Sequence, residues 1–231
     1  MTAYIEKLAP RLQCLVLLLQ VPATLGILVW VHPNPGKLIT LLMLWAFTFP
    51  RPSHSELLFF IAISAFFTIM NAAALAQGIF VFNDPDLLRM PMWELAMWGF
   101  YTLHTMRLIG GPTPKDRRAV AWVLALLFAA AFATLADAML LLAVTSALLV
   151  LALAFFHQAH DLAFVGYMIV LGAAVEYTGV HSGLWRYPGD PAGGVPLWFI
   201  TMWGGVGLFV RRLAMPLIAR HEPERDAVPT L

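Results

Sequence analysis

Apolar residues in this chain gather in long runs, separated by short stretches rich in proline, glycine and charged residues. The hydrocarbon core of a bilayer is about 30 Å thick, and a helix needs about 20 apolar residues to cross it. The pattern predicts eight transmembrane helices, over residues 12–31, 37–50, 56–77, 91–109, 117–136, 138–156, 161–182 and 195–216. We therefore expect an all-α, polytopic membrane protein.

The second half of the chain resembles the first when the sequence is shifted by 105 residues. Between residues 78–108 and 183–213, nine of 31 positions are identical without a gap. The predicted helices follow the same shift, which indicates two four-helix repeats, residues 1–110 and 111–219, followed by a polar cytoplasmic tail, residues 220–231. Because each repeat has an even number of helices, the repeats are parallel, and a shared site should lie near the axis between them.

The composition excludes several classes of protein. Hydrophobic residues make up 61% of the chain and charged residues 12%, with a mean hydropathy of +0.79, whereas about a quarter of an ordinary soluble domain is charged. A soluble globular enzyme, a disordered chain and a disulfide scaffold are therefore excluded. The net charge of +1 provides no basic surface for nucleic acid. Cys14, the single cysteine, has no partner for an internal disulfide.

The distribution of Lys and Arg predicts the orientation in the membrane. Eleven of the 14 cations fall on the side of the predicted bundle that holds both termini. The three on the other side are Lys37, Arg89 and Arg186. Cytoplasmic loops carry an excess of Lys and Arg, so we expect both termini in the cytoplasm and the loops 78–90 and 183–194 outside.

Two acidic residues are predicted to lie inside the membrane, Glu94 in the fourth helix and Glu176 in the seventh. Charged groups in hydrocarbon are costly, so such acids are functional candidates. We expect Glu176 to donate a proton to a carbon–carbon double bond. We expect Glu94, Asn71 or His181 to position water or to take up the final proton. Asn71 is a candidate because it is the counterpart of Glu176 under the shift. A structural acid bonded to neighbouring amides is the alternative.

Aromatic residues are dense around both acids, and aromatic faces stabilise cations. We expect seven of them to bind substrate: Trp93, Trp98, Tyr177, Trp185, Tyr187, Trp198 and Trp203. An interfacial aromatic belt is the alternative explanation. His157, His160 and Asp161 have a spacing that could bind metal, but Asp161 matches Glu56 under the shift, and both open a predicted helix, where an acid complements the helix dipole. No metal site is predicted.

The second repeat resembles the bacterial carotenoid 1,2-hydratase family. The resemblance rests on Glu-Tyr-Thr-Gly-Val-His-Ser-Gly-Leu-Trp-Arg-Tyr at 176–187, Gly-Val-Pro-Leu at 194–197 and Trp203. That family usually has Phe-Gly where this chain has Trp185-Arg186, a difference that could change the substrate.

The first repeat is similar to the lycopene cyclase domain. The similarity rests on Gly-Ile-Phe-Val-Phe at 78–82 and Pro-Met-Trp-Glu at 91–94. Trp93 stands where that domain has the first acid of a pair, so only Glu94 remains. Small integral-membrane terpene cyclases of meroterpenoid pathways are similar in size and in their use of membrane carboxylates.

The resemblance implies an isoprenoid- or carotenoid-modifying enzyme of the bacterial inner membrane, a hydratase, which is a lyase, or a cyclase. It would protonate an olefin and then hydrate or cyclise the cation, which needs no redox cofactor. The expected partners are a hydrophobic isoprenoid or lipid substrate and membrane lipids, with no nucleic acid. Two other functions stay open: a small-molecule or lipid transporter or channel with its site at the repeat interface, and a non-catalytic membrane accessory subunit.

Overall fold

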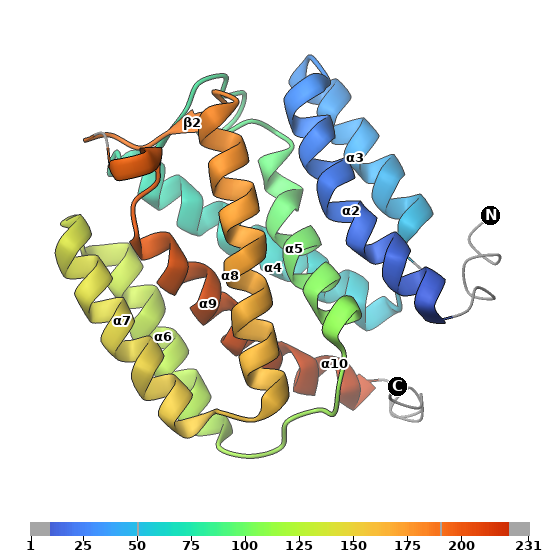
Figure 1. The fold of residues 1–231 in the computed structure, drawn as a ribbon, viewed down its shortest axis with the longest axis vertical. Helices are drawn as coiled ribbons and strands as arrows, with labels where there is room; N and C mark the ends of the chain where they lie inside the picture. Colours follow the sequence, from blue (N-terminus) through green and yellow to red (C-terminus); the bar gives the residue numbers. More distant parts are fainter. Residues whose placement is uncertain (1–9, 50, 190, 222–231) are drawn as a thin grey trace.

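The computed structural model describes residues 10–49, 51–189 and 191–221 (Figure 1). Residues 222–231 of the predicted polar tail lie outside these ranges. The elements, in chain order, are α2 (Pro10–Trp30), α3 (Asn34–Thr48), α4 (His54–Ala76), β1 (Val81–Phe82), α5 (Glu94–Ile109), α6 (Arg118–Thr134), α7 (Ala138–Phe155), α8 (Ala159–His181), β2 (Trp185–Arg186), the 3₁₀ turn η1 (Ala192–Gly194), α9 (Trp198–Phe209), the π turn η2 (Val210–Ala214) and α10 (Met215–His221). Within the described ranges the regular structure is helical apart from two short strands, as the apolar pattern predicts.

Five helices of the described residues are long and apolar enough to cross a membrane. They are Leu12–Trp30, His54–Ala76, Ala138–Phe155, Ala159–His181 and Ala192–Ile218. The helices α3, α5 and α6 match the other three predicted spans and have 15, 16 and 17 residues. At 1.5 Å per residue the longest of them covers about 26 Å, less than the hydrocarbon thickness of about 30 Å. The chain is a helical membrane protein, but its helix lengths establish fewer crossings than the eight predicted.

The helices pack in pairs that flank a central group. In Figure 1 the α2–α3 pair lies on one side, the α6–α7 pair lies on the other, and α4, α5, α8 and α9 lie between them. The central helices α5 and α9 are the shortest of the four, and most of their side chains are buried. Any polar group on the inner faces of α5, α8 and α9 is therefore far from solvent.

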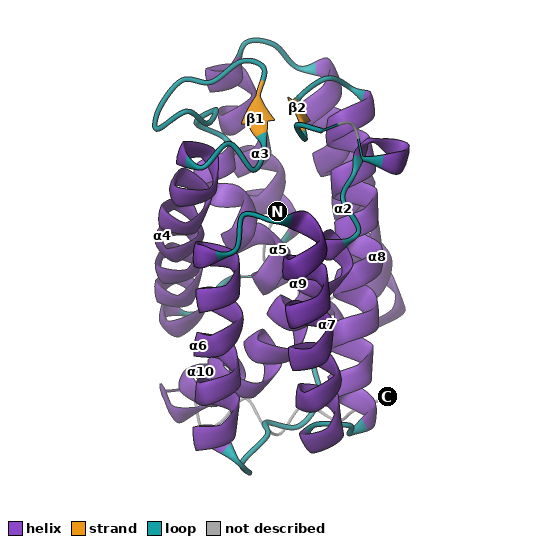
Figure 2. Cartoon of the chain, turned by 90° about the vertical axis from the view of Figure 1, so that its left-hand side faces the viewer, coloured by secondary structure: helices purple, strands orange, loops and turns teal. Residues whose placement is uncertain are grey.

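The strands β1 and β2 form an antiparallel pair that covers one end of the bundle (Figure 2). The paired residues are Val81 with Arg186 and Phe82 with Trp185. Each strand follows a long helix that ends in a glycine, Gly78 after α4 and Gly183 after α8, with φ of 72° and 70°. Glycine adopts this left-handed conformation without steric cost, so the segment after each helix can turn back over the bundle.

Buried ion pairs tie the opposite end of the bundle together. Arg107 Nη2 donates to Glu56 Oε2 at 2.7 Å, and both Arg211 and Arg212 donate to the buried Asp161. Consecutive side chains on an α-helix point about 100° apart. The π turn η2 and the length of the arginine side chains let both reach one carboxylate.

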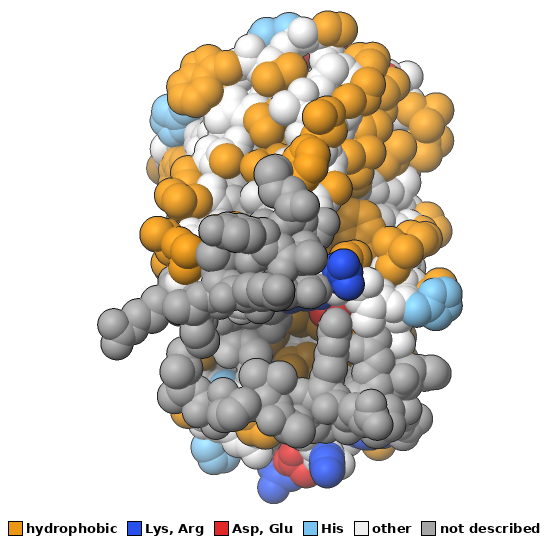
Figure 3. All heavy atoms as spheres, turned by 90° about the vertical axis from the view of Figure 1, so that its right-hand side faces the viewer, with side chains coloured by type: hydrophobic (Ala, Val, Ile, Leu, Met, Phe, Trp, Pro, Cys, Tyr) orange, Lys and Arg blue, Asp and Glu red, His pale blue; other side chains and the backbone are white. Residues whose placement is uncertain are grey.

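The outer surface of the bundle is apolar. On the face shown in Figure 3, hydrophobic side chains cover much of the described surface, and charged side chains gather toward the lower end. Large exposed apolar residues on α2 and α3 include Leu15, Leu19, Ile39 and Met43. An exposed apolar face of this extent suits contact with lipid acyl chains.

Candidate functional site

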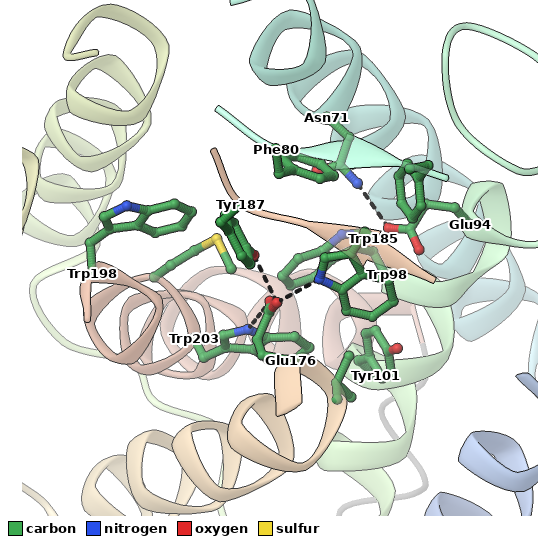
Figure 4. Close-up of a pocket in the computed structure, with 13 residues that line it drawn as sticks. Asn71, Phe80, Glu94, Trp98, Tyr101, Glu176, Trp185, Tyr187, Trp198 and Trp203 are labelled. Carbon is green, nitrogen blue, oxygen red and sulfur yellow. Dashed lines mark hydrogen bonds between the residues drawn. The ribbon is translucent and has the colours of Figure 1, made fainter. Parts of the chain in front are cut away.

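Glu176 is the centre of a buried hydrogen-bond cluster on the inner face of α8 (Figure 4). Its side chain is 5% exposed. Tyr187 Oη donates to its Oε2 at 2.7 Å, and Trp185 Nε1 donates to the same oxygen at 3.2 Å. Trp203 Nε1 donates to Oε1 at 3.1 Å. Three donors from β2, the residues that follow it, and α9 therefore hold one carboxyl group in place.

Two glycines on α8 make room for two of these donors. Gly172 and Gly179 lie four residues before and three residues after Glu176, so all three share one helix face. A Cβ at Gly172 would overlap the indole of Trp203, and a Cβ at Gly179 would overlap the indole of Trp185. Both indoles can lie flat on the helix and reach the carboxyl only because these positions have no side chain.

Glu94 is the second acid of the site and is the first residue of α5. Asn71 Nδ2, on α4, donates to Glu94 Oε1 at 2.8 Å. No hydrogen bond joins Glu94 Oε2 to any other described residue, and this oxygen stays free (Figure 4). The helix N-terminus favours a negative charge at this position.

A cavity of about 60 Å³ lies between the two acids. Its lining comes from α4, α5, α8, α9 and the segments around β1 and β2. The lining residues are Asn71, Phe80, Phe82, Glu94, Trp98, Tyr101, Val175, Glu176, Trp185, Tyr187, Trp198, Met202 and Trp203. Eight of these side chains are aromatic, and only the two glutamates among them carry a formal charge. The cavity is thus lined mainly by aromatic rings and carries two carboxyl groups.

Stacked aromatic rings form one wall of the cavity. Trp98 lies between Phe67, with ring centroids 4.0 Å apart, and Trp203, at 4.7 Å. Tyr101, one turn after Trp98, meets Trp203 edge-on at 5.1 Å. Tyr101 is only 3% exposed, yet its hydroxyl forms no hydrogen bond with the described part of the chain. Tyr101 lines the cavity, so its hydroxyl is available to a ligand there.

The acids lack a positive partner. Among residues 10–49, 51–189 and 191–221, no Lys, Arg or His forms an ion pair with Glu94 or Glu176. Arg107 of α5 and Arg211 of η2 instead pair with Glu56 and Asp161 at the other end of the bundle. An unpaired charge inside a membrane protein costs several kcal/mol, roughly 3 or more.

Most residues that the sequence singles out do converge on this cavity. These are Glu94, Glu176, Asn71, Trp98, Trp185, Tyr187, Trp198 and Trp203. Trp93 lies elsewhere, because its indole is turned toward α3, where its Nε1 donates to Asn34 Oδ1 at 3.1 Å. Tyr177 is 40% exposed, since it follows Glu176 by one position and projects from another face of α8.

His181 is also outside the cavity. It lies five residues after Glu176, and its Nδ1 hydrogen-bonds to the main-chain oxygen of Tyr177 at 2.9 Å. The structure therefore gives His181 no place beside either acid. The cavity has five further lining residues that were not predicted as site residues: Phe80, Phe82, Tyr101, Val175 and Met202. Tyr101 had a signal in the sequence, because it follows Glu94 by seven residues and so lies on the same helix face.

No family model matches this chain, and no curated protein matches it. Two solved structures are similar to it. One is a mycobacterial Insig homologue, MvINS from Mycobacterium vanbaalenii, with a TM-score of 0.63 and 21% identity. The other is a cross-linked trimer of a variant of MvINS, also with a TM-score of 0.63 and with 20% identity. Each match covers 78% of this chain and 100% of the other.

This likeness overturns the predicted function. The similar structures are those of an Insig homologue and not of a carotenoid hydratase or cyclase, so the prediction of an isoprenoid-modifying, olefin-protonating enzyme is wrong. The physical reason for the error lies in the motif. Gly179 makes room for an indole, Gly78 and Gly183 form the turns after α4 and α8, and three aromatic residues of the motif donate to Glu176. These are structural roles that such residues have in a membrane protein whether or not it is an enzyme.

Proposed function

We propose that this chain is a non-catalytic membrane accessory protein that binds an amphipathic molecule. The polar end of that molecule would enter the cavity between α4, α5, α8 and α9, and its apolar part would remain against the apolar surface of the bundle. One observation carries the proposal: an aromatic cavity beneath the β1–β2 pair is lined by Glu94 and Tyr101, and Glu94 Oε2 and the Tyr101 hydroxyl form no hydrogen bond with another described residue.

The hydrogen bonds of Glu176 favour binding over catalysis. An ionised carboxylate only accepts hydrogen bonds, and Tyr187, Trp185 and Trp203 all donate to this one. The three donors fix this carboxyl in one orientation within the cavity wall. A volume of about 60 Å³ suits a small head group and would not accommodate a long polyene.

We further propose that the chain crosses a bacterial cell membrane eight times as two parallel repeats, with both termini in the cytoplasm. The pairing of Val81 with Arg186 supports the repeats, because these strand partners are 105 residues apart. The excess of Lys and Arg on one side supports the orientation. Reporter fusions after Arg89 and after Arg186 should both give the signal of the outer side, and a cytoplasmic signal from either contradicts the eight-span arrangement.

A cavity-filling variant tests the binding function. Val175 lies next to Glu176, is 4% exposed and lines the cavity, so Val175→Phe should fill it. The matched control is Val170→Phe on the same helix, where the valine is 67% exposed. Purified protein in an uncharged maltoside detergent would be titrated with decylamine, decanol and decanoic acid, with tryptophan fluorescence as the readout.

The wild type and Val170→Phe should give a saturable change with at least one of the three probes, and Val175→Phe should lose it. Absence of saturable binding in the wild type, or equal binding by Val175→Phe, overturns the proposal. A second measurement compares membrane lipids from cells that express the wild type or Glu176→Gln by mass spectrometry. A hydrated or cyclised product that depends on Glu176 would show that the chain is an enzyme after all.

A further inference from the structure

The cavity offers acceptors in excess of donors. Glu94 Oε2 has no hydrogen-bond partner among the described residues, and Tyr101 Oη has none either. Glu176 Oε1 accepts from Trp203 only, and each carboxylate oxygen has room for about two donors. Glu94, Tyr101 and Glu176 all line the cavity, and each therefore has at least one acceptor site that no described residue fills.

The charge of the lining restricts what can fill that space. Glu94 and Glu176 are the only residues of the lining with a formal charge, and both are negative when ionised. An anionic head group would be repelled. A hydroxyl would use the hydrogen-bonding atoms but would leave the negative charges uncompensated in a medium of low dielectric constant.

The aromatic lining favours an organic cation over a metal ion. The rings of Phe80, Tyr187 and Trp198 surround the space, and aromatic faces attract ammonium groups. A small hard cation needs six or more oxygen ligands, but three of the four carboxylate oxygens here already accept hydrogen bonds from side chains of the cavity lining. Within the described residues no three His, Cys, Asp or Glu side chains form a metal-binding group.

We propose that the cavity binds a primary ammonium group carried on an apolar chain, with its three N–H donors directed to Glu94, Tyr101 and Glu176. An ammonium has three donors and no acceptor, so it can donate to one acceptor site on each of these three residues. Its positive charge compensates the charge of the two carboxyl groups, and its apolar chain can lie among lipid acyl chains. This inference names the ligand class for the proposed binding function and rests on it.

The test compares head groups on the same ten-carbon chain. Wild-type protein in maltoside detergent at neutral pH would be titrated with decylamine, which is then a cation, and with decanol, which is uncharged. We expect decylamine to bind at least about tenfold more tightly, which corresponds to about 1.4 kcal/mol. Partition into micelles is the same for every variant, so differences between variants report the cavity.

Two variants and one control assign the preference to named atoms. Glu94→Gln keeps the size of the side chain and removes its charge, so the preference for decylamine should fall below about threefold while decanol binding is retained. Tyr101→Phe removes one acceptor and should weaken decylamine several-fold, which keeps the test valid if Glu94→Gln fails to fold. The control is Asp137→Asn, an exposed acid outside the cavity, and it should match the wild type.

The outcomes separate this inference from the function on which it rests. Equal affinities for decylamine and decanol in the wild type, or an unchanged preference in both Glu94→Gln and Tyr101→Phe, overturn the ammonium site and leave a binding protein for neutral amphiphiles. Tighter binding of decanoic acid than of decylamine also overturns it. If no probe binds in a saturable manner, both the inference and the proposed function fail.

Discussion

Removal of the Tyr187 hydroxyl tests whether Glu176 is held as a buried carboxylate. Tyr187→Phe deletes the donor that lies 2.7 Å from Glu176 Oε2 and leaves the ring in place. The remaining donors, Trp185 and Trp203, contact the carboxyl at 3.2 and 3.1 Å. The shortest of the three hydrogen bonds is lost, and its acceptor stays buried. We therefore expect a lower free energy of unfolding.

The size of the effect depends on the charge of Glu176. A hydrogen bond to a charged group is worth about 1.5–3 kcal/mol, and one between neutral groups about 0.5–1.5 kcal/mol. A double-mutant cycle between Tyr187→Phe and Glu176→Gln isolates this pair. We expect a coupling energy of about 1.5–3 kcal/mol, measured by equilibrium unfolding in mixed micelles of maltoside and dodecyl sulfate.

Hydrogen bonds between transmembrane helices often contribute only about 0.6 kcal/mol, so a weak coupling is a real alternative. A value below about 1.5 kcal/mol, in the range of a neutral pair or weaker, would refute the reasoning that the three donors stabilise a charged carboxyl. Tyr177→Phe is the matched control. Tyr177 is next to Glu176 in the sequence but is 40% exposed, and loss of its hydroxyl should change the free energy of unfolding by less than about 0.5 kcal/mol.

Two further predictions concern the packing of α8 and the ion pairs. Gly179→Ala introduces a methyl group where the indole of Trp185 lies, so it should lower the free energy of unfolding by about 1–3 kcal/mol. Gly166→Ala is the control and should be tolerated, because no atom lies near its Cβ position. Equal effects of the two variants would contradict the packing argument. Arg212→Gln leaves the buried Asp161 with one guanidinium instead of two. In the same assay the free energy of unfolding should fall by about 3 kcal/mol, the lower end for a broken buried pair. A fall below about 1 kcal/mol would mean that Arg211 alone compensates the carboxylate.

The positions of the helices and of the acids follow from the sequence. Apolar runs locate the helices because each must bury or expose a continuous apolar surface. Glu94 and Glu176 line the same cavity because they lie at similar depths on helices that both border it. Asn71, which the 105-residue shift makes the counterpart of Glu176, hydrogen-bonds to Glu94, since helix α4 packs against α5.

The side-chain detail of the site does not follow from the sequence. Trp93 and Glu94 are adjacent in sequence, yet their side chains contact different neighbours. Trp93 donates a hydrogen bond to Asn34 because of the way α3 packs, which the sequence does not predict. The free hydroxyl of Tyr101 has no sequence signal beyond its helical spacing. The function could not be read from the motif because its glycines and aromatic residues support the cavity wall, which is needed by a binding protein and an enzyme alike.

The strand pair over the cavity also sets the order in which the site can be assembled during synthesis. Val81 finds its partner Arg186 only after about a hundred further residues have been made, and contacts so distant in sequence form late. A nascent chain that has inserted α2 to α5 already contains Glu94, Asn71 and Tyr101, but Tyr187, Trp185 and Trp203 are not yet present. Until the second half of the chain is made, Glu94 has only the amide of Asn71 as a hydrogen-bond partner among the described residues of the first half, and the cavity lacks the wall that α8, α9 and the residues around β2 supply.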